Sequence, residues 1–230
     1  MLQLKRKNDI LQLLREHKEL TVKELCAMLY SSPATIRRDL CELESEGLLK
    51  RSFGGAVLVE DYSNQLPRNL RYRTNIQAKK ALCAKAAQLI HDGDTVFIDA
   101  SSTTYFLAPY LKKYQELTVV TNNPGLSLLL SDMKIHNLCT GGEMLNDSCA
   151  LVGKEAEHFV SRIHAHKCFF SARGYTDIAS DSSRFERDIK EEMLAHANHT
   201  CFIADPSKRG SSFPYPIVNL ADVDCVVVEE

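Results

Sequence analysis

From residue 77 onward, short apolar runs alternate with segments in which apolar residues recur at a helical period. We expect the apolar runs to be strands at 95–98, 117–121, 135–140, 168–171, 201–204 and 224–228. We expect the intervening segments to be helices at 78–91, 103–113, 125–130, 154–163 and 184–198. This order predicts a Rossmann-like α/β fold, in which helices cover both faces of a mostly parallel sheet.

The composition narrows the class of protein. The chain has 230 residues, of which 44% are hydrophobic, and no apolar run approaches the roughly 18 residues of a membrane span. The N-terminus carries Lys5, Arg6 and Lys7 without an apolar segment typical of a secretion signal, so we expect a cytoplasmic protein without a membrane partner. Its eight cysteines are scattered and lack metal-site spacing, so we expect neither a metal nor a cofactor.

The first 58 residues have a different pattern, with three short helical segments followed by a hairpin. Residues 5–17 form the first segment, and Thr21 with Glu24 makes a capping box for the second. Ser32 is a suitable N-cap for the third, which would end at a Gly47 C-cap. Strands at 48–53 and 56–59 would flank a glycine turn, which completes a winged helix-turn-helix.

The third helix has one apolar face and one face suited to DNA. Ile36, Leu40 and Leu43 share the apolar face, whereas Arg38 points the opposite way. Arginine side chains match guanine edges and phosphate oxygens, and basic residues on the wing can meet the DNA backbone. The residues expected to contact double-stranded operator DNA are Ser32, Ala34, Thr35, Arg37, Arg38, Lys50 and Arg51. A small helical protein-interaction domain remains an alternative.

These patterns divide the chain into a DNA-binding domain at 1–58, a linker at 59–76 and an effector domain at 77–230. Residues 1–58 contain 10 Lys/Arg and 8 Asp/Glu, whereas the whole chain has a net charge of −2. The small positive excess therefore lies in the domain expected to bind DNA.

Ligands of parallel α/β sheets bind beyond the carboxyl ends of the strands, where this sequence places polar residues. The hydroxyl loop, residues 99–104, could cradle an anion or could simply be a hydroxyl-rich helix cap. Gly141 and Gly142 could allow close backbone approach to a ligand or form a plain turn. Glu186 and Lys190 have the spacing of a surface ion pair. The candidate effector-binding residues are Asp99, Ser101, Ser102, Thr103, Thr104, Asn122, Gly141, Gly142, Arg173, Glu186, Lys190 and Lys208.

The order of these motifs resembles the DeoR family of bacterial transcriptional regulators over nearly the whole chain. The matching segments are 35–40, 54–56, 92–95 with 99–104, 119–122, 141–142, 150–153, 186–190, and 204–205 with 207–208. The resemblance implies a repressor or activator of sugar-utilisation genes, with a sensor domain similar to ribose-5-phosphate isomerase. It also implies that the hydroxyl loop holds the phosphate of a phosphorylated sugar, and that the chain forms homodimers or homotetramers.

Three departures from the family pattern concern the effector site. Ser102 stands where the family usually has glycine, Arg173 stands where an acidic residue is common, and the chain between Arg173 and Glu186 is short. Arg173 could add a cation for a more highly phosphorylated effector, or the pocket could be partly lost. The alternatives are a regulator with a vestigial sensor and a sugar-phosphate isomerase, although Arg173 replaces the acid that a proton-abstracting enzyme would need.

Overall fold

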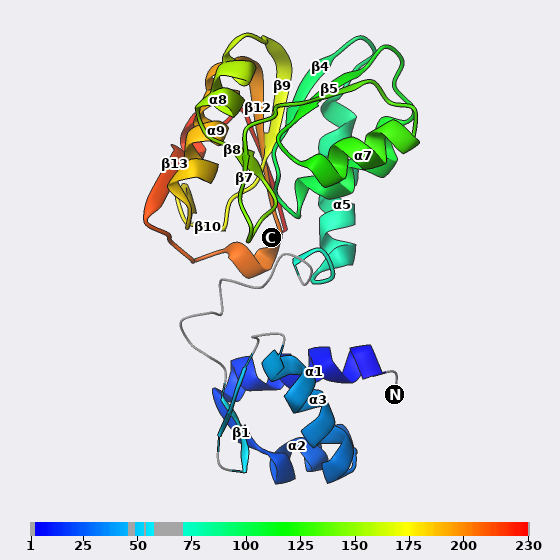
Figure 1. Ribbon diagram of the computed structural model, residues 1–230, viewed down its shortest axis with the longest axis vertical. Coiled ribbons are helices and arrows are strands. Elements are labelled where there is room, and N and C mark those ends of the chain that lie inside the picture. Colours follow the sequence, from blue (N-terminus) through cyan, green and yellow to red (C-terminus); the bar gives the residue numbers. More distant parts are fainter. Residues whose placement is uncertain (1–2, 46–48, 53, 58–70, 230) are drawn as a thin grey trace. The chain divides into compact units, whose positions relative to one another are not determined.

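The computed structural model describes residues 3–45, 49–52, 54–57 and 71–229 (Figure 1). The chain forms two compact units, Met1–Pro67 and Arg68–Glu230, which are treated separately below. Residues 71–75, within the stretch expected to be a linker, belong to the second unit, where Asn75 Nδ2 donates to Asp205 Oδ1 over 2.8 Å. None of the helices in the described ranges has the length and apolarity needed to cross a bilayer.

The N-terminal unit contains the predicted three helices and hairpin. The helices are α1 (Gln3–His17), α2 (Val22–Leu29) and α3 (Pro33–Ser45). Its antiparallel sheet has the order β1-β3-β2, formed by β1 (Glu19–Thr21), β3 (Gly55–Val57) and β2 (Lys50–Ser52). Strand β1 was not predicted, and the Gly47 C-cap lies outside the described residues. The arrangement is a winged helix-turn-helix.

Local sequence signals account for the turn between α2 and α3. The capping box is present, because Thr21 Oγ1 accepts from Glu24 N (3.2 Å) and Thr21 N donates to Glu24 Oε2 (2.7 Å). Helix α2 ends at Tyr30, whose φ of 49° lies in the left-handed region and whose side chain is 96% exposed. Ser32 Oγ then accepts from Thr35 N (3.3 Å), which caps α3.

The second unit is built on a six-stranded parallel sheet of order β14-β12-β9-β4-β5-β6. Its strands are β4 (Thr95–Ile98), β5 (Thr118–Thr121), β6 (Asn137–Cys139), β9 (Ala165–Phe170), β12 (Ala197–Ala204) and β14 (Cys225–Val228). Ile98 pairs with both Thr121 and Phe169, so the chain segments after β4, β5 and β9 emerge at one edge. The predicted parallel α/β fold is confirmed.

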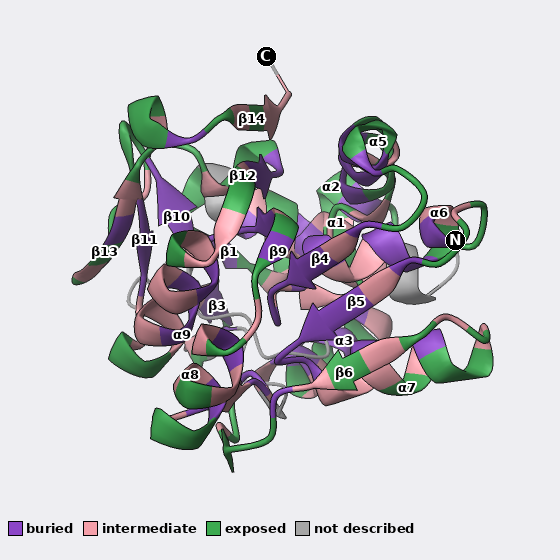
Figure 2. Ribbon diagram, turned by 90° about the horizontal axis from the view of Figure 1, so that it is seen from above, coloured by how far each residue is buried: buried purple, intermediate pink, exposed green. Residues whose placement is uncertain are grey.

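Helices cover both faces of this sheet (Figure 2). One face carries α5 (Ile76–Ala86), α6 (Ala108–Leu111) and α7 (Pro124–Asp132), and the other carries α8 (Lys154–Ser161) and α9 (Arg184–Ala195). Val96 and Ile98 pack in the core beneath α5, α6 and α7, whereas Phe97 packs in the core beneath α8 and α9. This is the alternation of side chains that a β-strand requires. Both cores are formed mainly by buried aliphatic and aromatic side chains.

Several elements of this unit were not predicted. A three-stranded antiparallel sheet contains β10 (Gly174–Tyr175), β11 (Ile178–Asp181) and β13 (Tyr215–Asn219), and β7 (Glu143–Met144) pairs with β8 (Leu151–Val152). Short 3-10 turns lie at η2 (Ala87–Leu89), η3 (Thr104–Leu107), η4 (Pro206–Lys208) and η5 (Leu220–Asp222). The helix expected at 103–113 is therefore η3 followed by the short α6, a correction to the prediction.

Candidate functional site

Helix α3 presents a basic surface on the N-terminal unit. Arg37 and Arg38 are exposed, while Ile36, Leu40 and Leu43 are buried on the opposite side of the helix. Ala34 is exposed and Thr35 is half-exposed, so small side chains precede the two guanidinium groups. A surface of this kind allows close approach to a DNA groove and supplies hydrogen-bond donors for bases and phosphates.

Beneath that surface, a buried acid links α3 to α1, which sequence reasoning missed. Asp39 is fully buried and accepts hydrogen bonds from Arg6 Nε and Nη2, the latter over 3.3 Å. The hydrogen bond to Asp39 raises the pKa of Arg6 above its ordinary value. This pair fixes the register of the two helices, because a buried carboxylate requires a partner.

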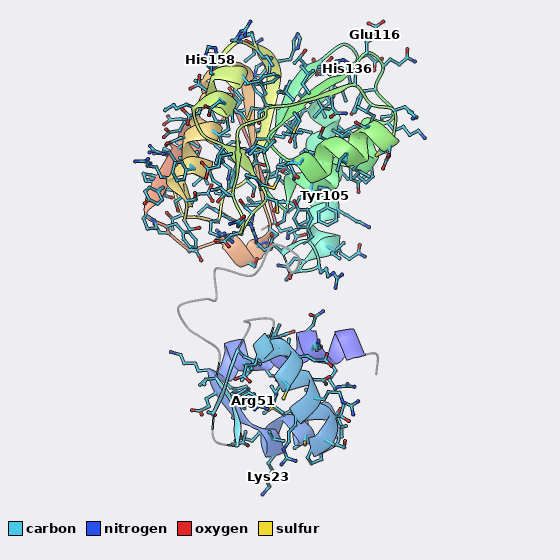
Figure 3. The ribbon with its side chains drawn as sticks, viewed as in Figure 1. Lys23, Arg51, Tyr105, Glu116, His136 and His158 are labelled. Atoms are coloured by element: carbon cyan, nitrogen blue, oxygen red, sulfur yellow. The ribbon has the colours of Figure 1, made fainter. Side chains whose placement is uncertain are left out.

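On the wing, Arg51 is held by contacts with residues of α3. Its Nε lies 2.9 Å from Glu44 Oε2, its backbone N donates to Glu44 Oε1 (2.9 Å), and its Nη1 donates to Cys41 Sγ (2.7 Å). Arg51 remains exposed (Figure 3), so the ion pair is one that a DNA phosphate can compete for. The side chain of Lys50 lies outside the described part of the chain.

In the second unit, Asp99 organises the hydroxyl loop. Its side chain is fully buried, and its Oδ1 accepts from Ser101 Oγ (2.8 Å) and Thr104 Oγ1 (2.7 Å). Its Oδ2 accepts from Ser171 N over 3.3 Å, which ties the loop after β4 to the segment after β9. Two of the four predicted loop hydroxyls thus bond to Asp99 and shape the loop.

The other two loop hydroxyls face ammonium groups. Lys208 Nζ donates to Thr103 Oγ1 (3.0 Å) and Ser171 Oγ (2.8 Å), and Lys79 Nζ donates to Ser102 Oγ (3.3 Å). Lys79 is 3% exposed, and it was not predicted. Ser102 is not among the described non-glycine residues with positive φ, so its backbone accommodates a side chain in place of glycine. Two ammonium groups therefore contact the Ser102 and Thr103 hydroxyls of the loop.

Burial controls the charge of these ammoniums. The pKa of Lys208 is lowered to about 7, chiefly by burial; the carboxylate of Asp205 opposes this shift, and the positive charge of Lys79 adds to it. Burial also lowers the pKa of Lys79. Asp205 itself has a lowered pKa despite its burial, because Lys208, Ser207 and Asn75 stabilise the carboxylate. An anion bound here would stabilise the protonated form of both lysines.

Lys190 belongs to a different pair from the one the sequence suggested. Its Nζ bonds Asp181 and lies 3.3 Å from Asp99 Oδ2, and the side chain is 7% exposed. Burial alone would lower the pKa of Lys190, but the carboxylates of Asp181 and Asp99 raise it above the ordinary value. The surface pair expected with Glu186 is thus corrected: Lys190 is a buried counter-ion, and Glu186 forms no ion pair with it within the described ranges.

Two arginines stand beside this network. Arg173 follows β9, and its backbone N donates to Asp181 Oδ1 over 2.9 Å. Arg71 was not predicted, and its carbonyl oxygen accepts from Lys79 Nζ (2.6 Å). Burial and the charge of Arg173 lower the pKa of Arg71, whereas Glu186 raises it. The two guanidinium groups thus lie near enough to repel one another, and Arg71 also lies near the ammonium of Lys79.

The remaining predicted residues have structural contacts. Asn122 is buried and its Nδ2 donates to Leu151 O over 3.0 Å, while its Oδ1 lacks a partner among the described atoms. Gly142 has a φ of 100°, and a Cβ there would lie 2.5 Å from Val152 O. Its close approach is to the protein's own backbone, whereas Gly141, with a φ of 70°, has open space around it.

A basic helix-turn-helix with a separate α/β unit that gathers cations at the ends of its strands is characteristic of a ligand-responsive DNA-binding regulator. The model of the DeoR-like helix-turn-helix domain matches residues 6–61, and that of the DeoR C-terminal sensor domain matches 74–230. The chain belongs to the DeoR family of transcriptional regulators and is not an enzyme.

Curated relatives match along the whole chain. The HTH-type transcriptional regulator GolR of Listeria innocua is 32% identical and is covered over 91% of its length. The HTH-type transcriptional repressor GlcR of Bacillus subtilis is 31% identical with 89% covered. The glycerol-3-phosphate regulon repressor of Escherichia coli is 30% identical with 92% covered, and each match spans 100% of this chain.

Solved structures with a partial likeness include ribose 5 phosphate isomerase A from Neisseria gonorrhoeae. It has a TM-score of 0.44 at 16% identity, with 60% of this chain and 55% of that chain covered. The translation initiation factor eIF-2B of Pyrococcus horikoshii has a TM-score of 0.48 at 17% identity, with 96% of this chain and 76% of that chain covered. The fold class follows from the strand order of the sheet and from the family match.

Proposed function

We propose that the protein is a repressor that binds operator DNA through α3 and releases it when a phosphorylated sugar or polyol occupies the second unit. The DNA-binding half of the proposal is supported by the exposure of Arg37 and Arg38 above a buried apolar face. The direction of regulation is supported by relatives whose names describe repressors.

One observation carries the effector half: Lys208 Nζ bridges Thr103 Oγ1 and Ser171 Oγ, while Lys79 Nζ donates to Ser102 Oγ. These contacts gather two ammonium groups and three hydroxyls at the carboxyl edge of a parallel sheet, where such folds bind ligands. A phosphate carries up to two negative charges and several acceptor oxygens, so it would satisfy both ammoniums. Candidate ligand groups are therefore the side chains of Ser102, Thr103, Lys79 and Lys208.

The effector would act by binding two arrangements of the protein unequally, since only a difference in affinity shifts an equilibrium. Asp99 is the natural point of coupling. Its carboxylate holds Ser101 and Thr104 of the loop, the backbone of Ser171 and the ammonium of Lys190. Movement of the loop towards a phosphate would alter each of these contacts.

The test begins with selection of binding duplexes from a random library by the full chain. The selected duplex is then titrated with and without each member of a panel of sugar and polyol phosphates, and thermal shift is measured on the same panel. We expect at least one compound to raise the melting temperature and weaken DNA binding. Lys208→Gln should weaken both effects, whereas Lys154→Gln, an exposed surface control, should retain them in full. A vestigial sensor predicts no response to any compound.

Assembly and location are part of the same proposal. A homodimer or homotetramer in the cytoplasm would place two α3 helices on one operator, because oligomeric helix-turn-helix proteins read half-sites about 34–36 Å apart. Light scattering of the full chain tests the assembly, and a palindromic selected site would support it.

A further inference from the structure

Two buried guanidinium nitrogens of the second unit lack hydrogen-bond partners. They are Arg71 Nε and Arg173 Nη1, and neither atom has a partner within the described part of the chain. A buried donor without an acceptor is unfavourable, and more so when it is charged. Two such donors near one another indicate a missing acceptor that both could share.

Nearby carboxylates do not neutralise this pair. Asp99 and Asp181 hold Lys190 between them, and neither Arg71 nor Arg173 forms an ion pair with another described residue. Glu186 and Asp181 act on Arg71 only through the longer-range electrostatic effect that partly offsets the lowered pKa. The local excess of positive charge therefore remains available to a bound anion.

The arginine pair lies next to the hydroxyl loop but is held by other contacts. Arg71 connects to the loop through its carbonyl oxygen, which shares Lys79 Nζ with Ser102 Oγ. Arg71 Nη2 donates to Asp147 O over 3.3 Å, and Arg173 is anchored through its backbone N to Asp181. Both guanidinium groups thus have fixed bases and free donors, the arrangement in which an arginine fork binds an oxyanion.

We propose that Arg71 and Arg173 form a second oxyanion subsite, so that the effector carries two acidic groups. This inference rests on the proposed function, in which the first group is a phosphate on the hydroxyl loop. The second group would be another phosphate or a carboxylate, since a guanidinium fork matches both. Arg173 then acts as a specificity-determining residue that favours doubly acidic sugars over simple monophosphates.

Calorimetry with matched probes tests the inference on the full chain. Fructose 1,6-bisphosphate is compared with fructose 6-phosphate for a second phosphate, and 6-phosphogluconate with glucose 6-phosphate for a carboxylate. We expect one doubly acidic probe to bind roughly tenfold or more tightly than its partner, as charge-assisted hydrogen bonds would produce. Arg173→Gln should bring that ratio close to one, and Arg173→Lys, which keeps the charge, should restore part of it.

A second variant guards against a folding defect. Arg71→Gln keeps the backbone carbonyl oxygen that accepts from Lys79, so the hydroxyl loop should stay intact. Because the variant lacks the guanidinium group, it should lose the same preference for doubly acidic probes. The double variant should lose no more of this preference than either single variant. Equal affinity for both members of each probe pair would overturn the second subsite while leaving the phosphate site standing. Absence of binding by all four probes and by the wider panel would overturn the proposed function as well.

Discussion

Asp99 and Lys190 form an ion pair in the interior of the second unit, with Lys190 Nζ 3.3 Å from Asp99 Oδ2. Lys190 also bonds Asp181 on β11, so one ammonium serves two carboxylates from different sheets. The pair therefore joins the end of β4 in the parallel sheet to the antiparallel sheet beside it. This junction supports the hydroxyl loop, because Asp99 also holds Ser101 and Thr104.

Replacing Lys190 by Met should destabilise the second unit strongly. The variant leaves two buried carboxylates without their cation, a change that typically costs about 3–5 kcal/mol. Thermal denaturation of the full chain should show a large drop in melting temperature relative to the parent protein. Lys154→Gln, which removes an exposed pair with Glu157, is the matched control and should change little. A melting temperature equal to that of the parent protein would contradict the assignment.

Effector affinity should fall as the pH rises above 7. Burial lowers the pKa of Lys208 to about 7, so the free site loses this positive charge in mildly alkaline solution. A bound phosphate favours the protonated ammonium, which means that binding at pH 8 takes up a proton and becomes weaker with rising pH. Calorimetry in buffers of different ionisation enthalpy would measure the uptake between pH 7 and 8.5. Lys208→Gln should remove this proton uptake; equal uptake in the variant would assign it to another group.

Arg38→Ala should weaken binding to a selected operator without affecting folding. Loss of a base-reading arginine costs about 1–3 kcal/mol and relaxes specificity at the base that it contacts. The side chain is exposed in the free protein, so the melting temperature should not change. Titrations at matched salt concentration with single-base operator variants would check both effects. Arg162→Ala, an exposed arginine of the second unit, is the control; equal losses in the two variants would argue against α3 as the reading helix.

Asp39→Asn should loosen α3 from α1. The substitution removes the charge that Arg6 bonds through two nitrogens, and hydrogen bonds to charged groups contribute about 1.5–3 kcal/mol. Hydrogen exchange of α3 amides should become faster, and operator affinity should fall because the helix is less firmly held. Glu42→Gln, which alters the neighbouring pair with Lys7 on a half-exposed position, tests whether any loss of charge on α3 has the same effect.

Sequence reasoning worked best where local signals decide the structure. The capping box at Thr21, the Ser32 cap and the period of Ile36, Leu40 and Leu43 each depend on residues within one or two turns. The parallel strands were likewise recognisable as short apolar runs bounded by turns. Strand β1 was missed because its three residues are too few to show a strand pattern, and the strand is defined by its pairing with β3.

The site could be predicted only in part, because its charges meet through distant contacts. The i, i+4 rule suggested Glu186 for Lys190, but the fold supplies Asp181 from β11 and Asp99 from the loop directly after β4. Strand β11 pairs with β13, which lies about forty residues later in the sequence, and no local pattern predicts this pairing. Lys79 and Arg71 lie before β4, the first strand of the second unit, so inspection of the strand ends of that unit could not find them. Their burial as cations is visible only once the sheet is assembled.

The left-handed turn at Tyr30 offers a practical consequence. The side chain is 96% exposed and sits three residues before α3, and the chain contains no tryptophan. Tyr30→Trp would exchange one aromatic residue for another at an existing backbone conformation and introduce a sole indole beside the recognition helix. Its fluorescence would then report the binding of operator DNA, and the release of that DNA when effector is added, in real time and without an attached dye.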